Sequence, residues 1–333
     1  MNAAPLLELE SLSVRFPVSL RKRVTAVDDV SMNLYEGETL GLIGESGSGK
    51  STVARAAIGL APVSGGKVKW RGEDVAGFRG REKRAFIEAI QMVFQDPHNA
   101  LDPRRTILRS VREPLDVMSR GKAQEREALA VKALEDVGLG SQFFGRYPHQ
   151  MSGGQKQRAN IARALVTHPQ VLICDESVAA LDVALQAEIL NLLGALKQEY
   201  ELTLLFISHD LSVVSHIADR MCVMYLGNIV EEAPTDSLMR QSYHPYSEAL
   251  LSAQPLVRGD SADRRIVLSG DIPSPLNPPA GCRFSSRCAH ATDSCTQAPP
   301  ELRAVGERHR SACFRVEELY GEAGANDAGQ ANR

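Results

Sequence analysis

The sequence of 333 residues lacks the two kinds of segment that would carry a chain into or across a membrane. The N-terminal stretch MNAAPLLELESLSVRF has no basic region followed by a long apolar run, so no signal peptide is predicted. No run approaches the roughly 18 consecutive apolar residues of a spanning helix, and the longest ones, such as LTLLF at 202–206, have the length of a strand. We therefore expect a chain that is soluble by itself and leaves any spanning to other chains.

An excess of charge of one sign is also lacking. The 38 Lys and Arg residues stand against 41 Asp and Glu residues, which gives a net charge of −3. This balance offers no electrostatic reason to expect nucleic acid as a partner, and we predict none. The sequence shows neither an internal repeat nor a sustained heptad. At about 100–200 residues per domain, the length suggests two domains.

Short apolar runs alternate with helical patterns along most of the chain. VLICDE at 171–176 and TLLFISH at 203–209 are typical of strands that are buried on both faces of a sheet. A helix is expected between them at 183–197, and helical patterns also mark 125–139 and 152–165. Strands that alternate with helices in this way predict an α/β fold with a mainly parallel sheet.

The composition changes after about residue 240, where PLNPPAGC and APPEL are rich in proline and disfavour regular structure. We expect a larger domain at 1–240 and a small, loop-rich domain at 241–320. The last stretch, 321–333, is small and polar, and we expect it to be disordered.

GESGSGKST at 44–52 fits the phosphate-binding pattern G-x-x-x-x-G-K-[ST] and follows an apolar strand, as that P-loop requires. The glycines let the backbone turn its N–H groups inward, where they and the next helix N-terminus cradle polyphosphate. Lys50 is expected to reach the β- and γ-phosphates, and the Ser51 hydroxyl to bind Mg²⁺. The strand before and the helix after disfavour the alternative of a chance Gly-rich turn. The nucleotide is expected to contact Gly44, Glu45, Ser46, Gly47, Ser48, Gly49, Lys50, Ser51 and Thr52.

Two adjacent carboxylates, Asp175 and Glu176, follow the apolar run VLIC at 171–174. A carboxylate at the end of such a strand can hold the Mg²⁺ of a P-loop site, and we assign that role to Asp175. Glu176 points elsewhere and is expected to take a proton from the attacking water. The alternative, acidic residues near the positive end of a helix, explains one surface carboxylate but not two behind an apolar strand.

The segment MSGGQKQR at 151–158 resembles the signature of the ATP-binding cassette (ABC) proteins. The order of P-loop, signature, acidic strand end and SHD at 208–210 makes this resemblance specific, and it covers about residues 6–240. It implies an ABC-type P-loop domain at 1–240, with a helical subdomain at about 96–165. Such a domain binds and hydrolyses ATP with Mg²⁺.

The resemblance assigns roles to single residues outside the P-loop. Gln95, in VFQDP, matches the glutamine loop of the family and would contact Mg²⁺ and water. His209 matches the switch histidine at the γ-phosphate, and Phe16 falls where the family stacks an aromatic ring on adenine. Asp182, in AALD, lies in the loop that bridges two subunits. The plainer alternatives are a loop position for Gln95, a helix cap for His209 and a core position for Phe16. The expected catalytic residues are Glu176, His209, Gln95 and Lys50.

The N-terminus of the helix expected at 152–165 is a second anion site. In the cassette family the signature of a facing chain covers the triphosphate that the first P-loop holds, so ATP joins two cassettes and hydrolysis separates them. The residues that would act in the facing site are Ser152, Gly153, Gly154 and Gln155.

Two segments depart from the family pattern. Met151 stands where the family usually has Leu, a change that conserves bulk. DESVAALD replaces the usual DEPTSALD, so Ser177, Val178 and Ala179 differ. We expect the loss of small polar residues beside Asp182 to weaken contacts across the dimer without removing a catalytic group.

Three further segments look like the ATPase subunits of dipeptide and oligopeptide importers, namely 92–107, 243–255 and 270–288. A repair ATPase would carry long heptad insertions, a tandem translation-type protein two P-loops, and a fused exporter its own spanning helices. The sequence shows none of these features, which leaves an importer ATPase. The segment at about 96–105 would lie near the permeases, or else be a plain exposed loop.

The resemblance also implies partners and a place. The partners are a companion ABC ATPase in a homo- or heterodimer, two permease subunits and an extracytoplasmic substrate-binding protein. The place is the cytoplasmic face of the cell's inner membrane, as a peripheral subunit. The cargo stays open among peptides, nickel, glutathione and sugars. A soluble regulatory or repair ATPase and an iron–sulfur redox enzyme are the rival functions from other classes.

The six cysteines fall into two groups. Cys174 and Cys222 lie inside apolar runs and are predicted to be small buried hydrophobes. The other four have spacings x5, x6 and x17, in which the tight pair of a zinc site is absent, and disulfides are disfavoured in a cytosolic chain. Four thiolates suit a structural [4Fe–4S] cluster, which the resemblance also implies, while zinc and free thiols are the alternatives. These four are Cys282, Cys288, Cys295 and Cys313.

Overall fold

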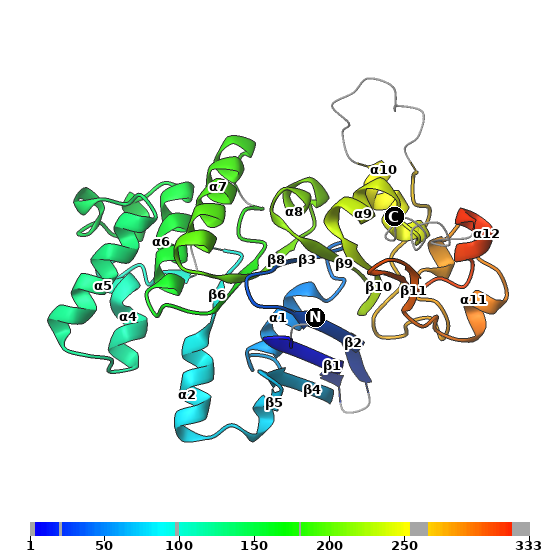
Figure 1. Ribbon diagram of the computed structural model, residues 1–333, viewed down its shortest axis with the longest axis horizontal. Helices are drawn as coiled ribbons and strands as arrows, with labels where there is room; N and C mark the ends of the chain where they lie inside the picture. Colours follow the sequence, from blue (N-terminus) through cyan, green and yellow to red (C-terminus); the bar gives the residue numbers. More distant parts are fainter. Residues whose placement is uncertain (1–3, 20–21, 97–99, 180, 254–265, 322–333) are drawn as a thin grey trace, which may run out of the picture. The chain divides into compact units, whose positions relative to one another are not determined.

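The computed structural model describes residues 4–19, 22–96, 100–179, 181–253 and 266–321 (Figure 1). They form two compact units, each built from segments that lie far apart in the sequence. We name them unit 1, which comprises Met1–Leu6, Leu34–Thr39 and Glu73–Ser208, and unit 2, which comprises Leu7–Asn33, Leu40–Gly72 and His209–Arg333.

Unit 1 contains three parallel strands, β6 (Ile90–Val93), β7 (Val171–Asp175) and β8 (Thr203–Ser208). The middle strand is β7, in which Val171 pairs with Ile90 on one side and with Thr203 on the other. Every residue of β7 and β8 is buried, as the continuous apolar runs predict for strands that are covered on both faces. Both predicted strands and the mainly parallel α/β arrangement are confirmed.

Helices account for most of the remaining residues of unit 1. The helices predicted at 125–139, 152–165 and 183–197 are confirmed as α5, α6 and α7. The bounds of the helices are α2 (Gly80–Ala89), α4 (Ile107–Val117), α5 (Ala123–Asp136), α6 (Gly153–Leu165) and α7 (Val183–Glu199).

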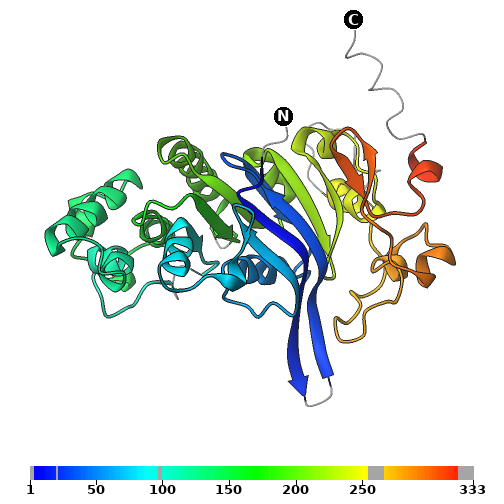
Figure 2. The same ribbon diagram turned by 60° about the horizontal axis from the view of Figure 1, so that its bottom comes forward.

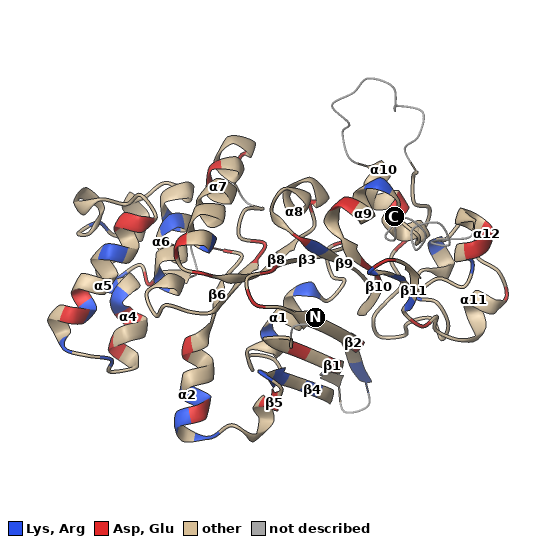
Figure 3. Cartoon of the chain, in the orientation of Figure 1, with Lys and Arg blue, Asp and Glu red and all other residues tan. Residues whose placement is uncertain are grey.

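Helices α4, α5 and α6 pack against one another. Their apolar faces are buried, among them Val111, Leu134 and Ile161. Arg112 pairs with Asp116 of its own helix at 3.0 Å and with a carboxylate of α5 at 2.9 Å. Figure 3 shows residues of both charges on these helices. The hydrophobic faces therefore hold the group together, and the exposed ion pairs add little.

Unit 2 contains two sets of strands. In the first, β1 (Leu7–Ser19) lies between β2 (Lys22–Leu34) and β4 (Gly65–Trp70), and it pairs with β4 antiparallel. In the second, β3 (Thr39–Ile43) runs parallel to β9 (Arg220–Tyr225), with the short helix α1 (Lys50–Ala57) next after β3 in the chain. All residues of β3 and β9 are buried, so the sheet holds the first residue of the P-loop, which follows β3, in place.

The C-terminal region continues the second set of strands (Figure 2). β10 (Asn228–Pro234) pairs antiparallel with β9, then β12 (His309–Ser311) pairs with β10, and β11 (Arg303–Gly306) pairs with β12. Five short helices are also described here. α8 (Leu211–Ile217) precedes β9. Between β10 and β11 lie α9 (Thr235–Arg240), α10 (Pro245–Ser252) and α11 (Ser294–Gln297), and α12 (Val316–Tyr320) follows β12.

None of the helices in the described ranges is both long enough and apolar enough to cross a bilayer. The tail expected to be disordered at 321–333 lies outside the described residues from 322 onward.

Candidate functional site

The P-loop of unit 2 joins the buried strand β3 to helix α1. Gly47 and Gly49 have φ values of +79° and +106°, in the region that only glycine enters freely. A Cβ atom at Gly49 would lie 2.3 Å from the carbonyl oxygen of Ala26, so no side chain fits there. The loop geometry thus depends on the glycines that the pattern requires.

Lys50 is the first residue of α1, and its side chain is buried against the loop. Its Nζ donates to the carbonyl oxygens of Gly44 at 2.7 Å and Glu45 at 3.0 Å. The N-terminus of α1 adds partial positive charge, whereas Ser46 and Gly47 are exposed. The loop therefore places a lysine and a helix N-terminus beside a segment that is open to solvent. This combination can bind a polyphosphate.

The two carboxylates of unit 1 have different surroundings. Asp175 is the last residue of β7 and is fully buried. Glu176 has a left-handed backbone with φ +46°, and its N–H donates to Ile207 O at 3.0 Å. A left-handed non-glycine residue is uncommon and marks functional sites when the surrounding structure enforces it. Asp175 is therefore enclosed by the unit, whereas Glu176 is partly exposed.

Gln95 and Glu176 come together although 81 residues separate them. The Gln95 Nε2 donates to Glu176 Oε2 at 2.6 Å. Gln95 lies two residues after β6 and is exposed, and β6 pairs with β7, which ends next to Glu176. The parallel pairing of the strands therefore brings the glutamine loop to the expected general base, where both can orient a water molecule.

The signature segment forms the N-terminus of α6. Ser152 is its N-cap: the hydroxyl accepts the N–H of Gln155 at 3.3 Å, and Gln155 Oε1 accepts the N–H of Ser152 at 3.1 Å. Ser152 and Gly153 are exposed, while a Cβ atom on Gly154 would approach Leu185 to 3.1 Å. The capping box thus fixes a helix N-terminus that remains open to a partner.

Asp182 is the N-cap of α7, and its side chain accepts the N–H of Leu185 at 2.9 Å. Two of the three departures beside it lie inside the unit, since Ser177 is 3% and Val178 1% exposed, while Ala179 is partly exposed. In this arrangement these two side chains pack internally rather than toward another chain. Met151 is also buried, in agreement with a substitution that conserves bulk.

His209 and Phe16 belong to unit 2. His209 is exposed and follows β8, and the cap of the next helix is Asp210, whose carboxylate accepts the N–H of Ser212 at 2.9 Å. The alternative of His209 as helix cap is therefore wrong. Phe16 is half-buried on β1, on the same face as the buried Leu12 and Val14, so it combines core packing with a partly exposed ring. Its contact with adenine stays a prediction.

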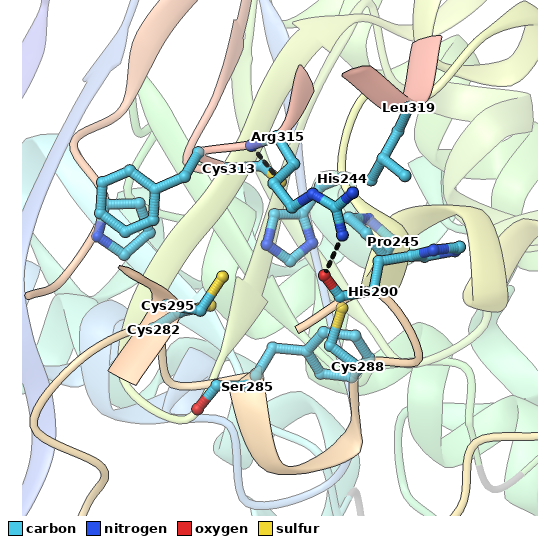
Figure 4. A pocket seen from close by; sticks show the side chains of 13 residues that line it. His244, Pro245, Cys282, Ser285, Cys288, His290, Cys295, Cys313, Arg315 and Leu319 are labelled. Atoms are coloured by element: carbon cyan, nitrogen blue, oxygen red, sulfur yellow. Dashed lines mark hydrogen bonds between the residues drawn. The ribbon is translucent and has the colours of Figure 1, made fainter. Parts of the chain in front are cut away.

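The four C-terminal cysteines line one cavity, to which His244 also contributes (Figure 4). Burial raises the pKa of Cys282 to about 11 and also raises the pKa values of Cys288 and Cys313. In each case a backbone N–H two residues later opposes the rise. The N–H of Arg315 lies 3.5 Å from Cys313 Sγ, so this contact is a hydrogen bond in the structure.

Within the described ranges, no three His, Cys, Asp or Glu side chains are grouped so that they could hold a metal ion. Cys174 and Cys222 are 0% and 1% exposed and behave as predicted, as small core residues. The four C-terminal thiols therefore share one cavity without forming a ready-made ion site in the described residues.

Two residues that the sequence analysis did not single out reach the P-loop. Arg287 binds the carboxylate of Glu45, with Nη1 and Oε2 2.7 Å apart, and the Tyr246 hydroxyl accepts the Glu45 N–H at 2.8 Å. These pairs are 242 and 201 residues apart, and no local pattern signals contacts of that length.

Comparison with known proteins adds two family matches and several close relatives. The model described as ABC transporter matches residues 27–179, and the model described as Oligopeptide/dipeptide transporter, C-terminal region, matches residues 230–295. The oligopeptide transport ATP-binding protein OppF of Salmonella typhimurium is 46% identical over 329 residues, which cover 94% of this chain and 97% of OppF. AppF of Bacillus subtilis, with the same description, is 44% identical over 321 residues, covering 94% and 98%.

Solved structures give the same family. A post-hydrolysis dimer of the ATP-binding cassette MJ0796 bound to ADP and Pi matches with a TM-score of 0.62 and 29% identity, covering 69% of this chain and 98% of that one. The cbiO1 subunit of the Clostridium perfringens transporter complex cbiONQ matches with a TM-score of 0.64 and 27% identity, covering 72% and 92%. The chain therefore belongs to the ATP-hydrolysing cassette subunits of ABC transporters, in the group that carries the oligopeptide/dipeptide transporter C-terminal region.

Proposed function

We propose that this chain drives an importer of dipeptides or oligopeptides by hydrolysing ATP. The observation that supports this proposal most directly is the similarity to oligopeptide transport ATP-binding proteins over 94% of the chain. The P-loop with Lys50 and the hydrogen bond between Gln95 and Glu176 support the hydrolytic part of the proposal. The rival cargoes are nickel, glutathione and sugars.

In the proposed mechanism the residues act at separate points of the ATP molecule. The P-loop backbone and Lys50 bind the phosphates, while His209 contacts the γ-phosphate and Phe16 stacks on adenine. Glu176 takes the proton of the attacking water, which Gln95 helps to orient. Bound Mg²⁺ neutralises charge on the phosphates. The residues that would hold it are Ser51, Gln95 and Asp175.

The proposed assembly has two cassettes, which place the signature of one against the nucleotide of the other. Ser152, Gly153, Gly154 and Gln155 would cover the phosphates of the facing P-loop, and Asp182 would lie at the boundary. Two permeases and an extracytoplasmic binding protein complete the importer, with this chain at the cytoplasmic face of the membrane. The segment at 96–105 would meet the permeases; its residues 97–99 lie outside the described part. The proposed domains are 1–240, with its helical subdomain at 96–165, and 241–320.

Uptake by the reconstituted importer tests the cargo. Proteoliposomes that contain the two cassettes and both permeases, with the binding protein outside and ATP inside, should accumulate a radiolabelled oligopeptide. Excess unlabelled peptide should abolish this uptake, whereas Ni²⁺, glutathione and a disaccharide should leave it unchanged. Accumulation of one of these three in place of the peptide would overturn the proposed cargo.

We also propose that the four C-terminal thiolates hold a structural [4Fe–4S] cluster. Their arrangement around one cavity, with the Arg315 N–H 3.5 Å from Cys313 Sγ, supports this proposal. The loop-rich segments between the cysteines contain few buried apolar residues, so a shared group would connect them. Zinc and free thiols are the alternatives.

Iron analysis tests the cluster. The full chain purified without oxygen should contain about four iron and four sulfide per molecule and absorb visible light. Cys288→Ser should lower the iron content strongly. Cys222→Ala, which changes a buried cysteine outside this cavity, should retain it. Stoichiometric zinc without iron, or parental iron content in Cys288→Ser, would contradict the proposal.

A further inference from the structure

Two residues of the C-terminal region hold Glu45, the second residue of the P-loop. Its carboxylate accepts two hydrogen bonds from the Arg287 guanidinium, with 2.7 Å between Nη1 and Oε2 and 3.2 Å between Nη2 and Oε1. Its backbone N–H donates to the Tyr246 hydroxyl at 2.8 Å. Two parallel bonds between a guanidinium and a carboxylate are strong and directional, so they fix the orientation of Glu45 as well as its position.

The contact is enclosed by packed rings. The side chain of Arg287 is 8% exposed, and its Nη1 also lies 3.4 Å from the Tyr225 hydroxyl. The rings of Tyr225 and Tyr246 are 4.7 Å apart, and the ring of Phe284 lies within 5.4 Å of both. All three aromatic side chains are fully buried. Arg287 is therefore held by its surroundings, unlike a long side chain on an open surface, whose ion pair adds little.

Glu45 connects this contact to the phosphate-binding lysine. Its carbonyl oxygen accepts the Nζ of Lys50 at 3.0 Å and the N–H of Ser48 at 3.2 Å. The side chain and N–H of Glu45 thus bond to the C-terminal region, while its carbonyl bonds inside the loop. Because the three groups share one Cα atom, the bonds to Arg287 and Tyr246 hold that atom in place and limit the directions that the carbonyl contacted by Lys50 can take.

We propose that Arg287 and Tyr246 are positioning residues for nucleotide binding, which hold the P-loop through Glu45 in the conformation that receives the phosphates. This rests on the proposed function, in which the P-loop binds ATP. Both residues lie outside the segment at 27–179 that matches the ABC transporter model. A loop that is already ordered loses less conformational freedom when it binds its ligand. The C-terminal region thereby raises the ATP affinity of the cassette.

Replacement of Arg287 tests the proposal in the full chain. Arg287→Met should weaken Mg·ATP binding about 10-fold, within the usual 5–150-fold range of coupling between sites. The KM for ATP should rise in proportion while kcat changes little, because the lost interaction acts on binding. Calorimetric titration and steady-state phosphate release measure these quantities. Arg112→Met removes a comparable arginine with two carboxylate partners and should change neither.

Milder variants and a mutant cycle separate positioning from general stability. Arg287→Lys keeps the charge but not the two parallel bonds and should give an intermediate KM. Tyr246→Phe removes only the hydroxyl and keeps the ring, so it should raise KM less than Arg287→Met. In a Glu45→Gln background, Arg287→Met should add little, because the first change already weakens the same pair.

Lys50→Met distinguishes failure of this inference from failure of the proposed function. If a folded Lys50→Met binds and hydrolyses ATP like the parent, Lys50 is not a phosphate ligand and the hydrolytic part of the proposed function fails. If Lys50→Met loses ATP while Arg287→Met keeps the parental KM, the positioning role alone is refuted. A fall in kcat without a rise in KM, or additive effects with Glu45→Gln, refutes it too. Should Arg287→Met not fold, parental affinity in both Arg287→Lys and Tyr246→Phe would equally refute the positioning role.

Discussion

Replacing Glu176 with glutamine should slow ATP hydrolysis about 10²–10⁴-fold and leave ATP binding intact. The amide has the shape of the carboxylate but cannot accept a proton from water. Its carbonyl oxygen can still accept the hydrogen bond from Gln95 Nε2, which measures 2.6 Å in the parent, so the local geometry should persist. Phosphate release at saturating ATP measures the rate, and calorimetric titration with Mg·ATP measures binding.

A second carboxylate serves as the control for Glu176. Glu188 lies on α7, is 58% exposed and pairs with Arg158 at 3.1 Å, and it is not one of the residues expected to contact ATP, Mg²⁺ or the attacking water. Glu188→Gln should keep the parental rate. Unchanged hydrolysis in Glu176→Gln would exclude Glu176 as the general base. Loss of ATP binding would mean that the carboxylate contributes to binding ATP and not only to its hydrolysis.

Replacing Lys50 with methionine should reduce ATP affinity by roughly 10–150-fold for each lost charge-assisted hydrogen bond, since each contributes about 1.5–3 kcal/mol. Hydrolysis should fall below detection, because the cation also stabilises the charge that develops on the transferred phosphoryl group. Methionine keeps the length of the side chain but has no donor for the carbonyls of Gly44 and Glu45. Titration with Mg·ATP measures the affinity.

The stability of the Lys50 variant has to be followed alongside its affinity, because the side chain is buried and bonded within the loop. Thermal unfolding without nucleotide reports on that contribution. Lys132→Met removes a lysine that is 56% exposed and pairs with Asp136, so it should change neither affinity nor rate. Parental ATP affinity in a folded Lys50→Met protein would rule out the lysine as a phosphate ligand.

Local sequence was sufficient for the parts of the site that depend on adjacent residues. The P-loop, the capped signature helix and the buried strand before Asp175 each form from one short segment, whose residue spacing reflects its backbone geometry. The left-handed backbone of Glu176, with φ +46°, could not be predicted, because a glutamate in the sequence does not indicate that conformation.

Contacts between distant segments could not be derived from the sequence. The pairing of Glu45 with Arg287 depends on the course of the chain after strands β9 and β10. The residues around each of the two give no indication of this contact. The same holds for the hydrogen bond from Gln95 to Glu176, where each residue was singled out but their contact follows from the pairing of β6 with β7.

The pairing of β12 with β10 bears on what a shortened chain would do. Without the C-terminal hairpin, β10 would present an uncovered row of N–H and C=O groups, which is the kind of strand border that recruits other polypeptides into aggregates. Glu231, a fully buried carboxylate on β10, would also lose its partner His309, whose Nε2 lies 2.7 Å away. We therefore expect a chain that lacks this hairpin to associate with itself more readily than the full chain, although its nucleotide-binding residues would all remain.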